Sequence, residues 1–92
     1  MKGKTRIKRL IPRLPELYKA HKRLEKRLGA PPSIREVAEE LGLGDNYVSR
    51  IHGDMEILTA LGLARRLPIP TRKFQCVGPP ADEINWEGLL SD

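Results

Sequence analysis

The stretch PPSIREVAEELGLGDNYVSRI, residues 31–51, constrains the fold more than any other part of this sequence. Ser33 and Glu36 have the S-x-x-E spacing of a capping box, so a helix is predicted to begin directly after Ser33. Gly42 is predicted to end that helix with a positive φ, and Asp45 is predicted to cap a second helix. Two short helices joined by a glycine turn form a helix-turn-helix.

Apolar side chains at steps of three and four residues support both helices. In the first helix they are Ile34, Val37, Ala38 and Leu41, and in the second they are Val48, Ile51, Met55, Leu58 and Leu61. The second pattern predicts a helix from Asn46 to Leu61. Gly53 interrupts it, and a glycine inside a helix costs about 1 kcal/mol relative to alanine. A kink, a break into two helices or a close packing contact is therefore expected there.

Another amphipathic segment precedes this motif. Its apolar side chains are Leu17, Tyr18, Ala20, Leu24 and Leu28, and the pattern ends at Gly29, which predicts a first helix. The opposite face carries Lys19, Lys22, Arg23, Lys26 and Arg27. These cations have two open interpretations, contact with a DNA backbone or a solvated face. His21 lies beside the apolar stripe and is expected to be a half-buried structural histidine.

The hydrophobic period changes after Gly62. Residues 63–67 and 73–77 have the pattern of two short strands, and the prolines between them predict a stiff turn. A hairpin that follows a helix-turn-helix is a wing. The predicted fold is mainly α with a small β-hairpin: a winged helix-turn-helix, made of a three-helix tripod plus the wing.

Charge divides the chain into three parts. Residues 1–27 carry eleven Lys/Arg against two Glu, residues 28–81 are balanced, and residues 82–92 carry four acidic residues and no basic one. We expect a basic flexible arm over residues 1–12, the winged domain over residues 13–78 and an acidic amphipathic tail over residues 79–92. A basic front end is what polyanion binding requires, because each neutralised phosphate releases counterions.

Several classes of function are not expected. The sequence has no nucleophile with an adjacent base, no phosphate-binding glycine loop and no zinc spacing, so neither enzyme activity nor a metal or other cofactor is predicted. Cys76, the single cysteine, is expected to be a small buried hydrophobe. Apolar runs are too short for a membrane span or a signal peptide, so a cytoplasmic, nucleoid-associated protein is expected.

The segment from Gly29 to Arg66, with GAPPSIREVAEELGL, a long helix and GLARR, resembles the winged-helix DNA-binding domain of LexA-type repressors. The resemblance covers about residues 14–77. It implies that the third helix enters the major groove and that the hairpin touches the DNA backbone. The family's self-cleaving domain, with its serine-lysine pair, has no counterpart in this sequence, so derepression by cleavage is not expected.

A second resemblance leads to an alternative function. The segment LPELYKAHKRLEKRLGAPPSIREVAEELGL is similar to the middle region of primary sigma factors, which has a P-[ST]-x-x-E-[IV]-A-x-x-L-G signature and no wing. That resemblance implies an RNA-polymerase-associated factor that acts through protein contacts. A sequence-specific DNA-binding regulator, a repressor, is the preferred prediction.

Specific residues are predicted to contact DNA. Arg50 suits a bidentate contact with guanine and Asn46 a contact with adenine or phosphate, with Tyr47 and Ser49 beside them as further base-facing residues. Asp45 and Asp54 are expected on the same outward surface, where they would weaken DNA binding. The predicted backbone contacts are Lys4, Arg6, Lys8, Arg9, Ser33, Arg35, Arg65, Arg66, Arg72 and Lys73.

The tail offers apolar anchors among carboxylates. They are Ile84, Trp86, Leu89 and Leu90. Packing of Trp86 on the chain's own core or on a dimer mate is the preferred interpretation, and docking on a different protein is the alternative. The expected partners are double-stranded DNA, a second copy of the chain as a homodimer and, in the alternative, RNA polymerase, with no membrane.

Overall fold

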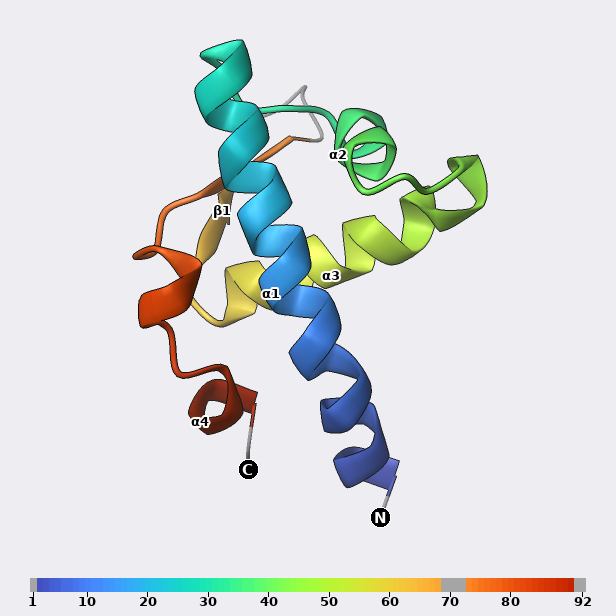
Figure 1. Ribbon diagram of the computed structural model, residues 1–92, viewed down its shortest axis with the longest axis vertical. Helices are drawn as coiled ribbons and strands as arrows, with labels where there is room; N and C mark the ends of the chain where they lie inside the picture. The colour runs from blue at the N-terminus through green and yellow to red at the C-terminus, as the bar shows by residue number, and fades with distance from the viewer. Residues whose placement is uncertain (1, 69–72, 91–92) are drawn as a thin grey trace.

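A computed structural model describes residues 2–68 and 73–90, with side chains from residue 9 onward. The elements in chain order are α1 (Lys2–Leu28), α2 (Ile34–Glu40), the 3-10 turn η1 (Asp45–Tyr47), α3 (Val48–Ala60), β1 (Ala64–Arg66), β2 (Phe74–Cys76), the 3-10 turn η2 (Ala81–Glu83) and α4 (Trp86–Leu90). Helix α1 runs along the length of the molecule. Helices α2 and α3 lie across α1, and α4 lies beside the N-terminal half of α1 (Figure 1).

The structure differs from the flexible arm predicted for residues 1–12. Helix α1 begins at Lys2 and continues through Pro12 and Pro15, which each remove a backbone donor. Leu10 and Leu14 are buried, and with Leu17 they extend the apolar stripe across both prolines. Burial of this stripe explains why the helix continues past them, and local composition did not reveal it.

The helix-turn-helix forms as predicted. Ser33 caps α2: its hydroxyl accepts from the Glu36 N–H at 3.1 Å, and the Glu36 carboxylate accepts from the Ser33 N–H at 2.8 Å. These hydrogen bonds hold the pKa of Glu36 below its ordinary value. Gly42 has a φ of 73°, a conformation that favours glycine after a helix.

The second helix of the motif begins differently from the prediction. Residues Asp45–Tyr47 form the 3-10 turn η1, and α3 begins at Val48. The expected cap by Asp45 is wrong, because neither η1 nor α3 has a side-chain capping hydrogen bond. Helix α3 is unbroken through Gly53, and a Cβ at that position would meet nothing within 4 Å. The expected break and the close packing contact are therefore both absent within the described chain.

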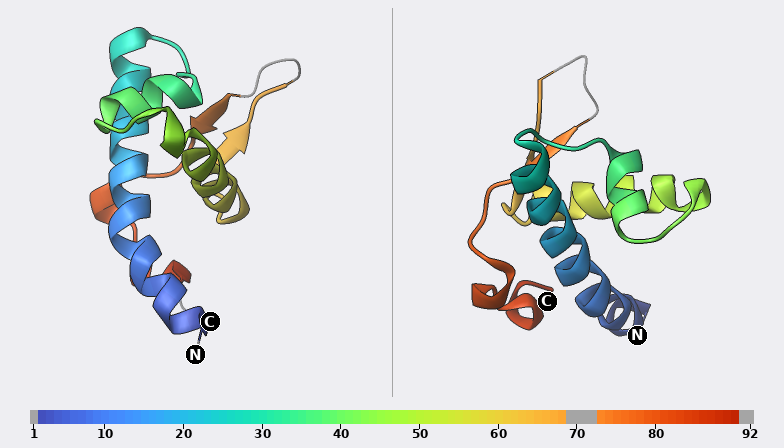
Figure 2. Two further views of the ribbon diagram at one scale, coloured as in Figure 1. Left: turned by 90° about the vertical axis from the view of Figure 1, so that its right-hand side faces the viewer. Right: turned by 45° about the horizontal axis from the view of Figure 1, so that its top comes forward.

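The predicted wing is present. Strands β1 and β2 pair antiparallel, with Ala64 opposite Cys76 and Arg66 opposite Phe74. The hairpin projects away from the helices (Figure 2). Phe74 and Cys76 face inward and are buried, which confirms Cys76 as a buried small side chain. The predicted turn residues 69–72 lie outside the described residues.

The tail packs on α1. Trp86 is buried and its ring meets that of Tyr18 edge to face, with 5.7 Å between centroids. The indole N–H donates to the Ala81 carbonyl at 3.2 Å, and the Tyr18 hydroxyl donates to the Pro79 carbonyl at 2.7 Å. These contacts favour the interpretation of Trp86 as a structural anchor of this chain's own core. Among the described residues, no helix has the length and apolarity needed to cross a membrane.

Candidate functional site

The four predicted base-facing residues lie together at the start of the second helix of the motif. Asn46 and Tyr47 belong to η1, Ser49 and Arg50 belong to the first turn of α3, and all four are exposed. The Arg50 guanidinium lies over the Tyr47 ring, 4.8 Å from its centroid. Such a cation–π contact restricts the conformations of the arginine side chain. The result is a small polar surface with one conformationally restricted cation.

Asp54 does not belong to this surface, contrary to the prediction. Its side chain is 4% exposed, and Arg13 of α1 donates two hydrogen bonds to it at 2.9 and 2.8 Å. This bidentate pair joins α1 to α3. Asp45 is exposed, so one of the two expected carboxylates remains near the polar surface.

The wing carries exposed cations. Arg65 donates from Nε to the Gln75 side chain at 2.8 Å. Arg66 lies over the Phe74 ring at 5.8 Å and is 3.4 Å from Glu56, with both charged groups about half exposed. Lys73 is half-buried next to them, whereas Arg72 lies outside the described residues. An exposed pair such as Arg66–Glu56 is weak, so Arg66 stays available to another anion.

Ser33 and Arg35 have different roles at the start of α2. The Ser33 hydroxyl already serves the capping box. Arg35 is exposed, on the first turn of the same helix. Arg35 is therefore the freer of these two predicted backbone contacts.

The basic N-terminus is helical in the structure. Lys4, Arg6 and Lys8 lie on the first turns of α1, and Arg9 is exposed on the same helix. The helical backbone over these residues differs from the extended arm that the sequence predicts.

The cationic face of α1 is largely engaged within the chain. Arg23 and Arg27 both donate to Glu40 of α2, at 2.8 and 2.9 Å, and they hold the pKa of Glu40 below its ordinary value. Lys22 donates to the Gly78 carbonyl at 2.6 Å, and Lys19 lies 3.4 Å from Asp82. This face therefore joins α1 to α2 and to the tail, which weakens its interpretation as a backbone-binding surface.

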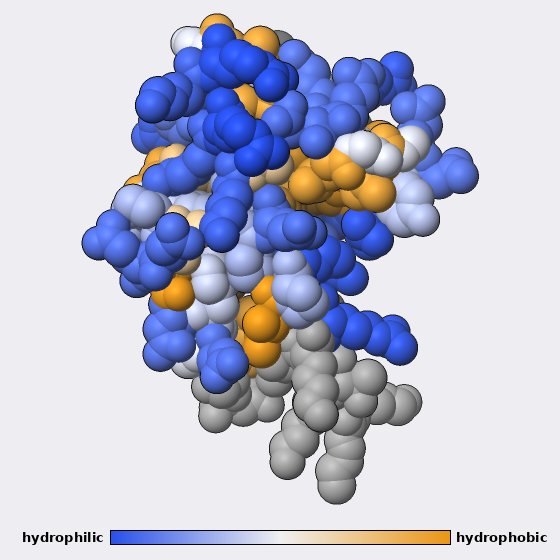
Figure 3. Space-filling model, viewed as in Figure 1, coloured by the Kyte–Doolittle hydropathy of each residue, from blue (hydrophilic) through white to orange (hydrophobic). Residues whose placement is uncertain are grey.

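Sequence reasoning missed a shallow pocket of mixed apolar and charged character. Apolar side chains gather between α1 and the turn after α2 (Figure 3), and a pocket between these elements is lined by Leu17, Leu41, Leu43 and Ile51. Arg13, Glu16, Arg50 and Asp54 also line it. The apolar periodicity of each helix predicted that Leu17, Leu41 and Ile51 face inward. The pocket forms only where α1, the turn after α2 and α3 meet, which periodicity does not show.

The predicted partner-binding residues of the tail differ in how exposed they are. Trp86 is buried, Ile84 and Leu90 are partly buried against the core, and Leu89 is 41% exposed. The side chains that would anchor a foreign partner thus already contact this chain, with Leu89 as the exception.

Comparisons with known proteins show similarity to LexA repressors. The LexA repressor of Staphylococcus epidermidis strain RP62A is 35% identical over 84 residues, which are 91% of this chain and 40% of the relative. The LexA repressor of Staphylococcus aureus strain N315 is 34% identical over 85 residues, again 91% of this chain and 40% of the relative. The fold is a winged helix-turn-helix of the LexA type. This chain spans about two fifths of the length of these LexA repressors.

The β-hairpin distinguishes between the two family resemblances found in the sequence, to LexA-type repressors and to primary sigma factors. The sigma-factor region implies no wing, whereas β1 and β2 form one here. No protein-family model and no solved structure matches the chain. The similarity to LexA repressors and the presence of the hairpin therefore favour the resemblance to LexA-type repressors over the resemblance to sigma factors.

Proposed function

We propose that this chain binds double-stranded DNA in a sequence-specific manner and represses transcription. The observation that carries the proposal is the exposed polar group of Asn46, Tyr47, Ser49 and Arg50 at the start of the second helix of a helix-turn-helix. In this motif, the N-terminal residues of the second helix read base edges in the major groove. The similarity to LexA repressors supports the same direction.

Each side chain has a chemical role in this proposal. Arg50 offers paired donors to O6 and N7 of guanine, and its stack on Tyr47 lowers the entropy lost when it binds. Asn46 suits the matching donor and acceptor of adenine. Tyr47 and Ser49 offer hydroxyl groups to phosphate or base edges. Asp45 repels phosphate and limits the approach to the backbone at this end of the helix.

Phosphate contacts position the helix in the groove. Cations on the wing and at the start of α2 and α1 supply them in this proposal. They are Lys4, Arg6, Lys8, Arg9, Arg35, Arg65, Arg66, Arg72 and Lys73. Ser33, at the N-terminus of α2 near Arg35, is a further candidate for a phosphate contact. Their contribution depends on salt but carries no sequence information.

The decisive experiment begins with selection of bound duplexes from a random pool, followed by titration of the selected duplex at several salt concentrations. Arg50→Ala is expected to weaken binding to the selected duplex by about 1–3 kcal/mol and to leave non-specific binding nearly unchanged. Arg66→Ala, on the wing, is expected to weaken both and to reduce the salt slope. Lys26→Ala, which removes an exposed cation from α1, is the control and is expected to change specific binding little.

The proposal is overturned if no duplex is enriched and the purified chain shows no salt-sensitive affinity for DNA. Equal losses for Arg50→Ala and Lys26→Ala would reject the role of Arg50. A two-fold symmetric consensus would also identify a homodimer through its half-site spacing.

A further inference from the structure

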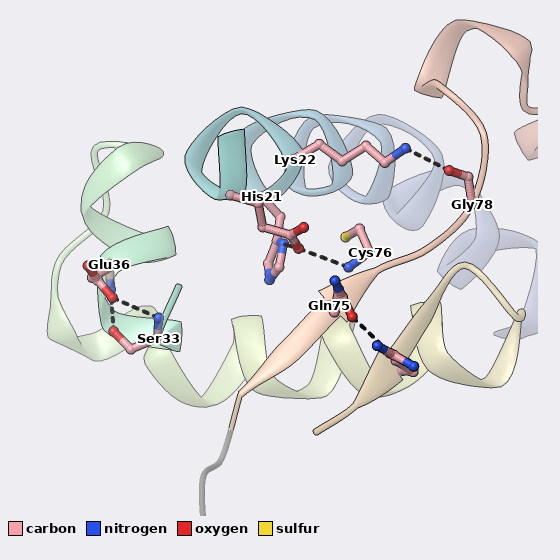
Figure 4. A network of polar contacts seen from close by, with 9 residues as sticks. His21, Lys22, Ser33, Glu36, Gln75, Cys76 and Gly78 are labelled. Carbon is pink, nitrogen blue, oxygen red and sulfur yellow. Dashed lines mark hydrogen bonds and ion pairs between the residues drawn. The ribbon is translucent and has the colours of Figure 1, made fainter. Parts of the chain in front are cut away.

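Three metal-binding side chains meet between α1 and β2. His21 and Glu25 lie one turn apart on α1. Cys76 lies on β2, facing His21 (Figure 4). One potential ligand atom from each residue lies within 4.8 Å of the other two. The wing strand and the long helix therefore share a cluster of one nitrogen, one oxygen and one sulfur donor.

His21 is the unusual member of the cluster. Its side chain is 1% exposed, and Nδ1 lies 2.8 Å from Oε1 of Glu25. Neither ring nitrogen makes a hydrogen bond of good geometry, and the polar groups within its reach are the Glu25 carboxylate and the Phe74 backbone. Burial lowers the pKa of His21, against the opposing effect of Glu25.

Glu25 also has a structural role that a metal ion would have to accommodate. Its Oε1 accepts from the Cys76 N–H at 3.0 Å, on the side of β2 that does not face β1. Oε1 also makes the contact with His21 Nδ1, so a metal ion would have to replace that contact or bind the other carboxylate oxygen. The hydrogen bond from the Cys76 N–H fixes Glu25 beside the Cys76 side chain, which positions two of the three ligands before any ion arrives.

The donor set and its charge suit a zinc ion. Zinc accepts imidazole nitrogen, carboxylate oxygen and thiolate sulfur in tetrahedral sites, and three protein ligands would leave the fourth position to a water molecule. A carboxylate and a thiolate together balance the charge of a divalent cation in a buried place. The Lys22 ammonium, bonded to the Gly78 carbonyl, is a nearby cation that opposes the ion, but the two anionic ligands outnumber it.

We propose that His21, Glu25 and Cys76 bind one zinc ion, which fastens the wing strand β2 to α1. Bond lengths of about 2.0–2.3 Å place tetrahedral ligand atoms closer together than the 4.8 Å limit of this cluster, so binding draws the three side chains together. Zinc binds the thiolate form of cysteine, so Cys76 must lose its thiol proton. Binding therefore releases the thiol proton to solvent as the sulfur–zinc bond forms.

Cobalt(II) titration of the full chain tests the site, because a thiolate bound to cobalt gives a charge-transfer absorption band that oxygen and nitrogen ligands do not. We expect one cobalt ion per chain, the band, and loss of the band when zinc is added. Cys76→Ser is expected to abolish the band. Glu25→Gln, which keeps an oxygen acceptor for the Cys76 N–H, is expected to weaken binding by about tenfold or more.

The matched control is His52→Gln. His52 and Glu56 form a second histidine–glutamate pair one turn apart, 3.6 Å from each other, but they are 38% and 44% exposed and belong to no cluster with a cysteine in the described chain. Loss of this pair is expected to leave cobalt binding unchanged. Circular dichroism establishes that each variant is folded, and Glu25→Gln remains informative if Cys76→Ser unfolds.

Absence of the charge-transfer band in the folded wild-type chain would overturn the proposal. The proposal would also fail if Glu25→Gln bound cobalt as tightly as the wild type, or if His52→Gln removed the binding. These outcomes are independent of DNA affinity, so the zinc site and the proposed function stand or fall separately.

Discussion

At the scale of single residues, the pair Arg13–Asp54 changes the interpretation of α3. Helical spacing places Asp54 near Arg50 and Gly53, which suggested an outward carboxylate. The structure instead buries it against a guanidinium from α1, 41 positions away in the sequence. A carboxylate that would repel phosphate is thereby neutralised and removed from the reading surface, and it fixes how α3 lies on α1.

The two members of this pair are expected to respond unequally to substitution. Arg13→Gln leaves a buried carboxylate without its cation and should lower the free energy of unfolding by about 3 kcal/mol. Asp54→Asn should cost less, about 1–2 kcal/mol, because Arg13 is 32% exposed and its charge can reach water. Urea unfolding of both variants and of the double variant measures the difference. Equal costs would contradict the assigned asymmetry.

Gly53 is expected to limit the stability of α3. It is exposed inside the helix, and a Cβ there would meet nothing within 4 Å. Gly53→Ala should therefore raise the free energy of unfolding by about 1 kcal/mol and Tm by several degrees. Gly42→Ala is the contrasting variant, since Gly42 has a φ of 73° and alanine there should destabilise the chain. A lower Tm for Gly53→Ala would show that this helix is strained in a way that the described contacts do not reveal.

At the scale of elements, α1 and α2 are joined by charge as well as by apolar packing. Glu40 accepts from both Arg23 and Arg27, and its side chain is 14% exposed whereas the two arginines are about three fifths exposed. The two guanidinium groups stabilise the charged carboxylate and so hold its pKa below the ordinary value of 4.5. The helix-turn-helix is thus attached to α1 through a contact that acid can remove.

The stabilisation by Glu40 should depend on pH. A carboxylate whose pKa is lower in the folded state contributes stability above its unfolded pKa of 4.5 and loses it as pH falls through the folded pKa. Glu40→Gln should therefore lower the free energy of unfolding at neutral pH, and the difference from wild type should shrink below pH 4.5. Glu39→Gln, exposed on the same helix, is the control. A difference that persisted unchanged in acid would contradict an ionic origin.

At the scale of the whole molecule, α1 is the element that contacts the most other elements. It packs on α2, α3, β2 and α4. The tail contacts α1 where the Trp86 ring meets the Tyr18 ring edge to face. The long helix therefore carries the core of the winged domain on one part of its surface and the acidic tail on another. Residues at opposite ends of the sequence lie together at one end of the molecule (Figure 1).

The tail is expected to stabilise the whole chain. Trp86→Ala removes a buried ring and its edge-to-face contact with Tyr18, and should lower the free energy of unfolding by about 2–4 kcal/mol. Leu89→Ala, at an exposed site of the same helix, should change it by less than about 0.5 kcal/mol. Thermal unfolding of the two variants compares these effects. An unchanged Tm for Trp86→Ala would reject the anchoring role and favour docking on another protein.

Much of the fold could be predicted from local patterns. The capping box at Ser33, the positive φ at Gly42 and the hairpin after Gly62 all depend on interactions within a few residues, so the sequence reveals them directly. The exposure of Asn46 and Arg50 follows in the same way, from the periodicity of one helix. DNA contact by these residues stays a prediction that the selection and titration experiments test.

Other features depend on contacts between distant residues, and local patterns did not reveal them. The helical N-terminus depends on burial of Leu10 and Leu14, and the pairing of Asp54 depends on Arg13 from another helix. The cluster of His21, Glu25 and Cys76 has no recognisable spacing, because 51 residues separate Glu25 from Cys76. The sequence by itself determined the helix-turn-helix and its wing through local hydrogen bonds and hydrophobic period. Only the tertiary structure decided which charges are buried together, because desolvation and pairing depend on neighbours that the folded chain brings close.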